Sequence, residues 1–250
     1  MKRILFSISI FTSCLSFSQF DVSIHTGGGV SYISNSATVN MNHLTYGAPV
    51  RAFPKASLEG GITASYAFKR HSFDLGVLYS QIRSLNTEDT FYDLDYGMGL
   101  THLYVEKMRT IGYLAIPLQV NRDYNLVSFG AGVQPQFALH VNEEKKMWTD
   151  FSDSPETVAF LPDDRTIRTF DLGWIGNFCY HGTKHLSLSL KVYWGLWNIN
   201  NFGEKGAVYE FFQIENPVVD RKLKNRQFTM SVKYHIFGKK EGNVTSFEEF

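Results

Sequence analysis

The sequence has no surplus of charge, few cysteines and no long apolar run. Its 250 residues include 24 basic and 24 acidic ones, so the formal net charge is zero. Proteins that bind nucleic acid normally carry a basic surplus or a basic stripe, so this balance argues against that class. No apolar run reaches the roughly 18 residues that a transmembrane helix needs. We therefore expect neither a nucleic-acid-binding protein nor a helical membrane protein.

Charged residues are scarce, while aromatic ones are abundant. Charged residues make up 19% of the chain, aromatic residues 15% and hydrophobic residues 44%. Such a chain can bury enough apolar surface to fold, which excludes intrinsic disorder. Twenty glycines and only seven prolines suit a β-rich chain with many turns, and the length fits a single all-β domain.

Residues 1–18 have the pattern of a secretory signal peptide. Lys2 and Arg3 form a short basic segment, and the apolar stretch 4–11 follows it. Small residues then lead to a predicted cleavage site after Ser18. The segment is too short and too rich in serine to cross a bilayer as a helix.

The two cysteines, Cys14 and Cys179, bear on processing and on redox state. Cys14 lies within the predicted signal and admits an alternative, a lipoprotein cysteine, although the three residues before it match a lipobox poorly. Cleavage after Ser18 leaves Cys179 alone, so the mature chain has no second cysteine for an intramolecular disulfide.

Alternation of apolar and polar residues with period two recurs along the mature chain, as expected of strands whose two faces meet different surroundings. It is clean in four segments and weaker in four others. The clean segments are 57–68, 126–141, 186–197 and 227–236, and the weaker ones are 21–34, 72–85, 103–121 and 165–181. The pattern predicts eight strands.

The connections between these segments alternate between long loops and tight turns. The long ones are 35–56, 86–102, 142–164 and 198–226, and the tight ones are 69–71, 122–125 and 182–185. Loops this long are uncommon in compact domains, and the alternation is typical of bacterial outer-membrane barrels. We therefore predict an all-β, eight-stranded antiparallel transmembrane β-barrel over 19–237, with short periplasmic turns, long extracellular loops and a periplasmic tail at 238–250. The alternative is a soluble eight-stranded barrel.

The two faces of the predicted strands differ in chemistry. Strand ends carry aromatic residues, among them Trp174, Trp194 and Trp197, as the interfacial belts of a membrane barrel do. The polar face carries ionisable residues that are costly in hydrocarbon but tolerated in a hydrated lumen. These are Asp21, His25, Glu59, Asp171, Lys191 and Lys233. Because eight strands leave a lumen that side chains can fill, we expect these residues to pair with each other and to close the pore.

Pro117 falls inside the predicted strand 103–121. Proline cannot donate to a strand ladder, and a closed barrel has no edge strand on which to place it. We therefore expect a bulge at Pro117. Such a bulge would also explain why the alternation before Gly112 is out of phase with the alternation after it.

The stretch around this proline resembles a known family. Residues 110–120 read Thr-Ile-Gly-Tyr-Leu-Ala-Ile-Pro-Leu-Gln-Val, and 129–132 read Phe-Gly-Ala-Gly. Together they resemble the signature of PorT-like outer-membrane β-barrel proteins, although Ala115 stands where that family commonly has Glu. The signal ending Ser-x-Ser before Gln is also typical of exported Bacteroidota proteins. The resemblance implies an outer-membrane location and an eight-stranded barrel, and some members resemble components needed for type IX protein secretion.

Motifs for catalysis or for a metal are weak. Loop residues that a lipid-modifying hydrolase might bring together are His43, His102, Ser152, Asp153 and Ser154. Neither a Gly-x-Ser-x-Gly elbow nor a His-x-Ser-Asn arrangement is present in the sequence. Asp93 and Asp95 lack the further oxygen ligands of a calcium loop. We therefore expect no enzyme activity and no catalytic, cofactor-binding or metal-binding residues.

The long predicted loops are better suited to binding. Loop 198–226 combines aromatic residues with a basic cluster, and aromatic and arginine residues are the usual anchors of an interface. The candidate partner-binding residues are Tyr209, Phe211, Phe212, Arg221, Lys222 and Lys224. The apolar segment 209–214 either extends the wall as strands or contacts a partner.

Three functions agree with these features. We expect a closed scaffold or partner-binding subunit of an outer-membrane assembly, which the family resemblance links to protein secretion and which binds through its extracellular loops. A small solute or ion pore and an outer-membrane lipid-modifying enzyme are the alternatives. The expected partners are outer-membrane lipid, lipopolysaccharide and other outer-membrane or secretion-machinery proteins, with no cofactor and no nucleic acid.

Overall fold

The computed structural model describes residues 20–39, 51–93, 100–149, 156–158, 167–199 and 219–236. The predicted signal peptide, the predicted tail, and Tyr209, Phe211 and Phe212 of the predicted binding loop lie outside the described residues. No helix within the described ranges is long and apolar enough to cross a membrane.

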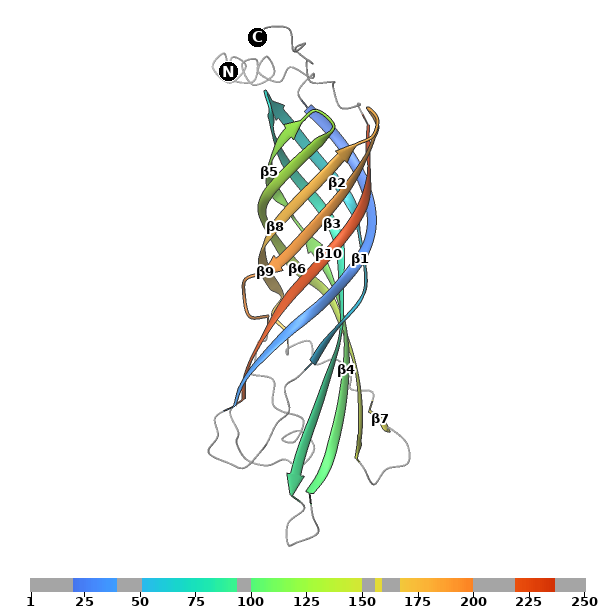
Figure 1. The fold of residues 1–250 in the computed structure, drawn as a ribbon, viewed down its shortest axis with the longest axis vertical. Helices are drawn as coiled ribbons and strands as arrows, with labels where there is room; N and C mark the ends of the chain where they lie inside the picture. The colour runs from blue at the N-terminus through green and yellow to red at the C-terminus, as the bar shows by residue number, and fades with distance from the viewer. Residues whose placement is uncertain are drawn as a thin grey trace, which may run out of the picture.

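Antiparallel strands make up the fold (Figure 1). They are β1 (Phe20–Val39), β2 (Arg51–Phe68), β3 (His71–Asp93), β4 (Leu100–Ala115), β5 (Leu118–Tyr124), β6 (Val127–Thr149), β7 (Glu156–Val158), β8 (Phe170–His181), β9 (Leu186–Gly195) and β10 (Val219–His235). Aromatic and β-branched residues, which favour extended backbone, are frequent along these strands. The sequence-based prediction of an all-β antiparallel class is confirmed.

Strand pairing closes the sheet on itself. The order along the sheet is β2-β1-β10-β9-β8-β6-β4-β3-β5, and β2 also pairs with β3. All of these pairings are antiparallel. Closure gives each of the long strands two neighbours, so the ring presents no open edge to template aggregation.

The described residues contain ten strands, where the sequence predicted eight. β4 and β5 share both neighbours, because each pairs with β3 and with β6. β5 therefore continues the line of β4 beyond Ile116 and Pro117, where the ladder is interrupted as the missing proline N–H requires. The Pro117 carbonyl still accepts a hydrogen bond from the Gly76 N–H at 3.0 Å. β7 is a three-residue strand beside β6.

Tight turns join the strands at one end of the ring. Two of them consist of Lys69–Arg70 and Asn125–Leu126, and the third spans 182–185. Lys69 and Asn125 have φ angles of 55° and 48°. A positive φ at the first turn residue matches the twist of the flanking strands in a two-residue hairpin, so these two positions close the hairpins tightly.

At the opposite end the strands extend far beyond their predicted ends. β3 and β4 stay paired as far as Asp93 opposite Leu100, and in Figure 1 these two strands reach farthest from the short turns. β1 and β10 stay paired as far as Val39 opposite Val219. Much of the four predicted long loops is therefore strand.

This extension corrects the placement of the predicted binding loop. Because β10 begins at Val219, Arg221, Lys222 and Lys224 lie in a strand and not in a loop. The sequence pattern missed this part of β10 because the apolar-polar alternation marks only the C-terminal half of the strand, from about Phe228 onward. Backbone pairing extends N-terminally beyond it, to Val219.

The ring is apolar on its outer face and polar on its inner face. Val232 is 50% exposed, whereas its neighbours Ser231 and Lys233 are 6% and 8% exposed. The same alternation recurs along β8 and β9. A soluble barrel has the reverse arrangement, with its apolar face inward, so the faces agree with the predicted membrane barrel.

The lumen changes character where the strand extensions begin. There the inward side chains form an apolar cluster, which we call the plug. Its members are Ile33, Ile82, Ile111, Tyr113, Ile167, Ile199 and Leu223. Ile167 and Ile199 come from the segments flanking β8 and β9, so residues outside the strands help to fill the interior.

The apolar residues change face near Gly112, although the inward positions of the backbone do not. Inward positions alternate without a break from Val105 to Asn121, across the Pro117 interruption. The prediction that a bulge at Pro117 shifts the phase is therefore wrong. Before Gly112 the apolar inward residues are Val105 and Ile111, and the two inward positions between them hold Lys107 and Arg109. After Gly112 most apolar residues point outward, where the outer face of the ring is apolar. The register shift against β4 lies in β6, where it leaves Leu139 unpaired.

Candidate functional site

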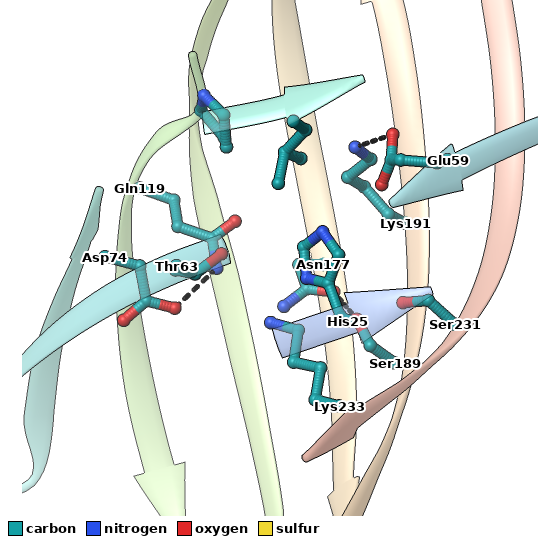
Figure 2. Close-up of a pocket in the computed structure, with 12 residues that line it drawn as sticks. His25, Glu59, Thr63, Asp74, Gln119, Asn177, Ser189, Lys191, Ser231 and Lys233 are labelled. Carbon is teal, nitrogen blue, oxygen red and sulfur yellow. Dashed lines mark hydrogen bonds and ion pairs between the residues drawn. The ribbon is translucent and has the colours of Figure 1, made fainter. Parts of the chain in front are cut away.

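Polar side chains fill the lumen between the short turns and the plug. In the middle of this region, the Lys191 ammonium forms an ion pair with Glu59 (Figure 2). It also donates to the Gln134 amide oxygen at 3.2 Å. Lys191 comes from β9 and Glu59 from β2, which are not neighbours in the sheet, so the ion pair crosses the lumen. Each buried charge is thereby offset by the other.

His25 and Lys233 lie beside this ion pair and are also buried. Neither ring nitrogen of His25 has a hydrogen-bond partner among the described residues. Both side chains line a cavity of about 20 Å³, together with Asn177. A cavity of this size holds about one water molecule.

Asp171 belongs to a separate cluster at the base of the plug. Its Oδ2 accepts hydrogen bonds from the Tyr193 hydroxyl at 2.8 Å and from the Asn225 amide at 2.7 Å. The Asn225 amide also donates to the Tyr113 hydroxyl at 2.9 Å. These four side chains come from β8, β9, β10 and β4, so the cluster ties several parts of the wall together across the interior.

At the short-turn end, a chain of hydrogen bonds runs along the inner wall. Asp21 Oδ2 is 2.5 Å from His235 Nδ1, and His235 Nε2 is 2.9 Å from Ser187 Oγ. The same hydroxyl oxygen is 2.9 Å from His181 Nδ1, and His181 Nε2 is 3.2 Å from Ser128 Oγ. This chain borders a cavity of about 60 Å³.

Buried cations reappear beyond the plug, on the inner face of the strand extensions. Lys107, Arg109 and Lys145 are all buried there. Arg109 Nε donates to Glu143 Oε2 at 2.6 Å, in an ion pair between β4 and β6. The plug therefore lies between two polar layers of the interior.

The predicted lumen residues all point inward, but they do not form one network. Lys191 and Glu59 meet, whereas Asp21 and Asp171 contact other residues. The partners that sequence reasoning missed are Tyr113, His181, Ser187, Tyr193, Asn225 and His235. All of them occupy inward positions of the strands, which the alternation indicated except for Asn225, since the sequence placed Asn225 in a loop, and their pairing depends on the register between distant strands.

The predicted partner-binding residues are only partly described. Lys224 is half-buried, and its backbone carbonyl accepts a hydrogen bond from Ser34 Oγ at 3.1 Å. The backbones of Arg221 and Lys222 lie in the β10 ladder opposite β1. No group of three or more His, Cys, Asp or Glu side chains in the described part of the chain is arranged to hold a metal ion.

Comparison with known proteins gives one family match. A family model described as outer membrane protein beta-barrel domain matches residues 17–201, which is most of the chain. No curated protein matches the sequence significantly.

Several solved structures align with most of this chain, but their sequence identity to it is low. Neisserial surface protein A is 12% identical, with 86% of this chain and 96% of that chain covered and a TM-score of 0.34. OprG from Pseudomonas aeruginosa is 13% identical, with 85% and 95% covered and a TM-score of 0.33. Ail of Yersinia pestis, solved with the heparin analogue sucrose octasulfate, is 8% identical, with 85% and 98% covered and a TM-score of 0.27.

Proposed function

This chain belongs to the outer membrane protein beta-barrel domain family, and we propose that its ring of strands is an eight-stranded transmembrane barrel. In this proposal β4 and β5 are two halves of one wall strand, interrupted at Pro117, and β7 is an addition to β6 outside the wall. Bacterial single-chain outer-membrane barrels have an even number of antiparallel strands. Eight strands enclose a lumen that side chains can fill.

The short turns face the periplasm in this proposal, and the strand extensions project outside the cell. Outer-membrane barrels generally combine short periplasmic turns with longer extracellular connections. Export begins with the signal peptide at 1–18, and residues 238–250 form a periplasmic tail. The apolar outer face of the ring meets lipid, with lipopolysaccharide surrounding its extracellular rim.

The filled lumen is the observation that carries the functional proposal, a closed scaffold. The ion pair of Glu59 with Lys191, the Asp171 cluster and the plug follow one another along the interior. The two cavities on the short-turn side of the plug are small, at about 20 and 60 Å³, and leave room for only a few water molecules in all. A barrel filled in this way supports a structural or binding role more than a conducting one.

We place partner binding at the projecting end. β3, β4 and β6 extend there as a paired sheet beyond the ring (Figure 1), and binding surfaces concentrate on segments carried by a rigid scaffold. Segment 209–214 precedes β10 in the chain, and Arg221 and Lys222 lie near the start of β10 at this end. The partner is another outer-membrane or secretion-machinery protein, and the PorT-like residues 110–120 support a link to type IX secretion.

Planar-bilayer recording tests the closed lumen. The purified full chain should give negligible single-channel conductance, because the plug blocks the lumen. Regular conductance steps would instead favour the alternative, a solute or ion pore. Lipid A mass spectra from deletion and wild-type cells address the second alternative, because a lipid-modifying enzyme would change them.

Loop replacement tests partner binding. Replacing 204–216 by a short Gly/Ser linker spares β10 and should abolish co-purification of the native partner, while the folded protein still migrates differently with and without boiling. Replacement of 94–99 by a linker of equal length serves as the control and should leave co-purification unchanged. Full partner recovery with the 204–216 replacement would contradict the proposal.

A further inference from the structure

Four outward side chains form one row across the wall, at the edge of the apolar outer face. Tyr32, Arg226, Trp194 and Trp174 lie opposite one another on β1, β10, β9 and β8, which follow one another around the ring (Figure 1). Side chains that are opposite in antiparallel strands are neighbours on the same face. The row therefore places one arginine between a tyrosine and two tryptophans on the surface of the ring.

The rows on either side show that this one marks a boundary. The next row toward the short turns consists, in the same strand order, of Val30, Phe228, Val192 and Gly176. Its three side chains are apolar and exposed. Toward the strand extensions, the next outward residues of β1 and β10 are Ser34 and Lys224, which lie opposite each other. On these strands the apolar outer face thus ends at the arginine row.

Arg226 is held in one position by its neighbours. Its guanidinium carbon lies 3.7 Å from the centroid of the Trp194 ring. Nη1 donates to the carbonyl oxygens of Gly195 at 2.7 Å and Asn225 at 3.1 Å. Nε and Nη2 donate to none of the described residues, and neither is a buried atom without a partner, so this edge is open to the outer face. The edge formed by Nε and Nη2 matches two oxygens of a phosphate.

A fixed arginine edge above an apolar wall suits an anionic lipid, whose phosphate and acyl chains need these two surroundings side by side. In the proposed orientation the boundary lies in the outer leaflet, where the lipid is lipopolysaccharide. We propose that Arg226 binds a phosphate of lipid A, the phosphorylated and acylated sugar of lipopolysaccharide, and that its acyl chains pack against β1, β10 and β9. This inference rests on the proposed function, because it takes its leaflet from the proposed orientation.

Two further cations add to the attraction. Lys224 is two residues from Arg226 on the same face of β10, which separates their backbones by about 7 Å. Arg168 is exposed, and its backbone N–H donates to the Ile199 carbonyl at 2.7 Å. The Ile199 N–H in turn donates to the Leu223 carbonyl at 2.9 Å, so Arg168 lies alongside this end of β10. Among the outward side chains that the structure describes on β1, β8, β9 and β10, none is acidic. The surface is therefore complementary to phosphate in charge.

The aromatic members of the row belong at the depth of the lipid head groups. Tyrosine and tryptophan are enriched at that level because their rings combine an apolar body with a polar group. Trp174 and Trp194 are exposed, and so is Trp197, whose ring lies 5.2 Å from that of Phe170. These rings offer the sugar of lipid A a surface level with Arg226.

A second arginine provides a matched comparison at the other end of the wall. Arg122 is exposed near the short turns, and its guanidinium carbon lies 5.3 Å from the centroid of the Tyr124 ring. It therefore resembles Arg226 in charge and in its aromatic neighbour, but its guanidinium is farther from the ring. In the proposed orientation it faces the periplasmic leaflet, so it should not contribute to lipid A binding.

Native mass spectrometry of the folded protein in detergent, with diphosphoryl lipid A added, tests the proposal. The wild type should retain one lipid A molecule. Arg226→Gln removes the charged donors and should weaken this binding roughly 10-fold or more. Arg122→Gln is the matched control and should bind like the wild type. Equal binding by the two variants, or no complex with the folded wild type, overturns the proposal.

Further comparisons keep a folding defect apart from loss of the site. Each variant is first required to show the boiling-dependent gel shift of a folded barrel. Lys224→Gln leaves Arg226 and its carbonyl contacts in place and should weaken binding by a smaller factor than Arg226→Gln, because lysine acts only as a point charge. Equal binding by Lys224→Gln and the wild type would overturn the assignment of Lys224 to the site.

The lipid can also be varied while the protein stays unchanged. Lipid A without its phosphates should bind the wild type roughly 10-fold more weakly or less, since it lacks the group that Arg226 recognises. Phosphatidylglycerol has a phosphate but no sugar to contact the tryptophan rings, so it should compete poorly. Equal binding of the dephosphorylated form, or full displacement by phosphatidylglycerol, overturns the assignment to lipid A.

This site and the proposed function can fail separately. Detergent has no inner and outer leaflet, so lipid A binding in it does not depend on the orientation of the barrel. Binding should survive the 204–216 replacement, and Arg226→Gln should leave the conductance of the barrel negligible. Absence of the lipid A complex from a folded, non-conducting barrel would overturn this site alone. Conductance steps from a barrel that still binds lipid A would overturn only the closed scaffold.

Discussion

At the scale of single residues, the ion pair between Glu59 and Lys191 should be among the costliest contacts to break. Their side chains are 2% and 9% exposed. Glu59→Gln removes one charge and leaves the Lys191 ammonium buried without its counter-ion, which costs about 3–5 kcal/mol. Chemical denaturation in detergent micelles should show this loss in the free energy of unfolding.

The double variant of this pair provides the control. Glu59→Leu combined with Lys191→Met removes both charges, so neither is left uncompensated, and the double variant should be more stable than Glu59→Gln. If the two losses simply added, the charges would not be interacting across the lumen, and this part of the interior would be hydrated instead of paired.

At the scale of elements, the glycines of β1 have unequal roles. A Cβ built on Gly29 would collide with the carbonyl oxygen of Phe228 in β10, whereas a Cβ on Gly28 has its nearest neighbour at 3.4 Å. Gly29→Ala should therefore push β1 and β10 apart and destabilise the fold by about 1–3 kcal/mol, as overpacking does. The fraction of protein that shows the folded gel band at increasing temperature measures the effect.

Gly28→Ala is the matched control for this prediction, since it adds the same methyl group to the same strand. It should melt at nearly the wild-type temperature. Equal destabilisation by the two substitutions would mean that the close approach of β1 to β10 is not what requires glycine in β1. Another property of glycine, such as its backbone freedom, would then explain the run.

The outer face of β9 supports a second prediction at this scale. Val192 is 45% exposed and lies near the middle of the strand. Val192→Arg places a cation in the hydrocarbon, which costs roughly 2–4 kcal/mol near the bilayer midplane. Unfolding titrations in lipid vesicles should show the loss, and Val192→Leu should show little. An unchanged stability for Val192→Arg would place this position outside the lipid-facing band.

At the scale of the whole molecule, ring closure should make the protein heat-modifiable. A closed barrel keeps its compact form in detergent until it is boiled, so the unboiled protein should migrate faster on a gel than the boiled protein. The mature protein should also fractionate with outer membrane and resist carbonate extraction, because its outer face is apolar. Recovery in the soluble periplasmic fraction without a gel shift would contradict the membrane assignment.

The sequence by itself predicted the all-β class and the two faces of the strands. Period-two alternation is a local property of extended backbone, and along β9 and β10 it continues for the full width of the apolar band. The exposed apolar outer face and the inward direction of Asp21, Glu59 and Lys191 followed from that pattern alone. Pro117 indicated an irregularity in its strand, since the missing N–H is a property of the residue, but the sequence predicted a bulge there and the structure has an interruption between β4 and β5 instead.

The tertiary structure alone decided where the strands end and which inward residues meet. Beyond the apolar band the outer face no longer has to be apolar, so the pattern loses its period while the backbone ladder continues from Arg226 to Val219. Contacts across the lumen depend on ring closure and on register. Asp21 contacts His235 because β1 pairs with β10, and no local pattern in either strand specifies this contact.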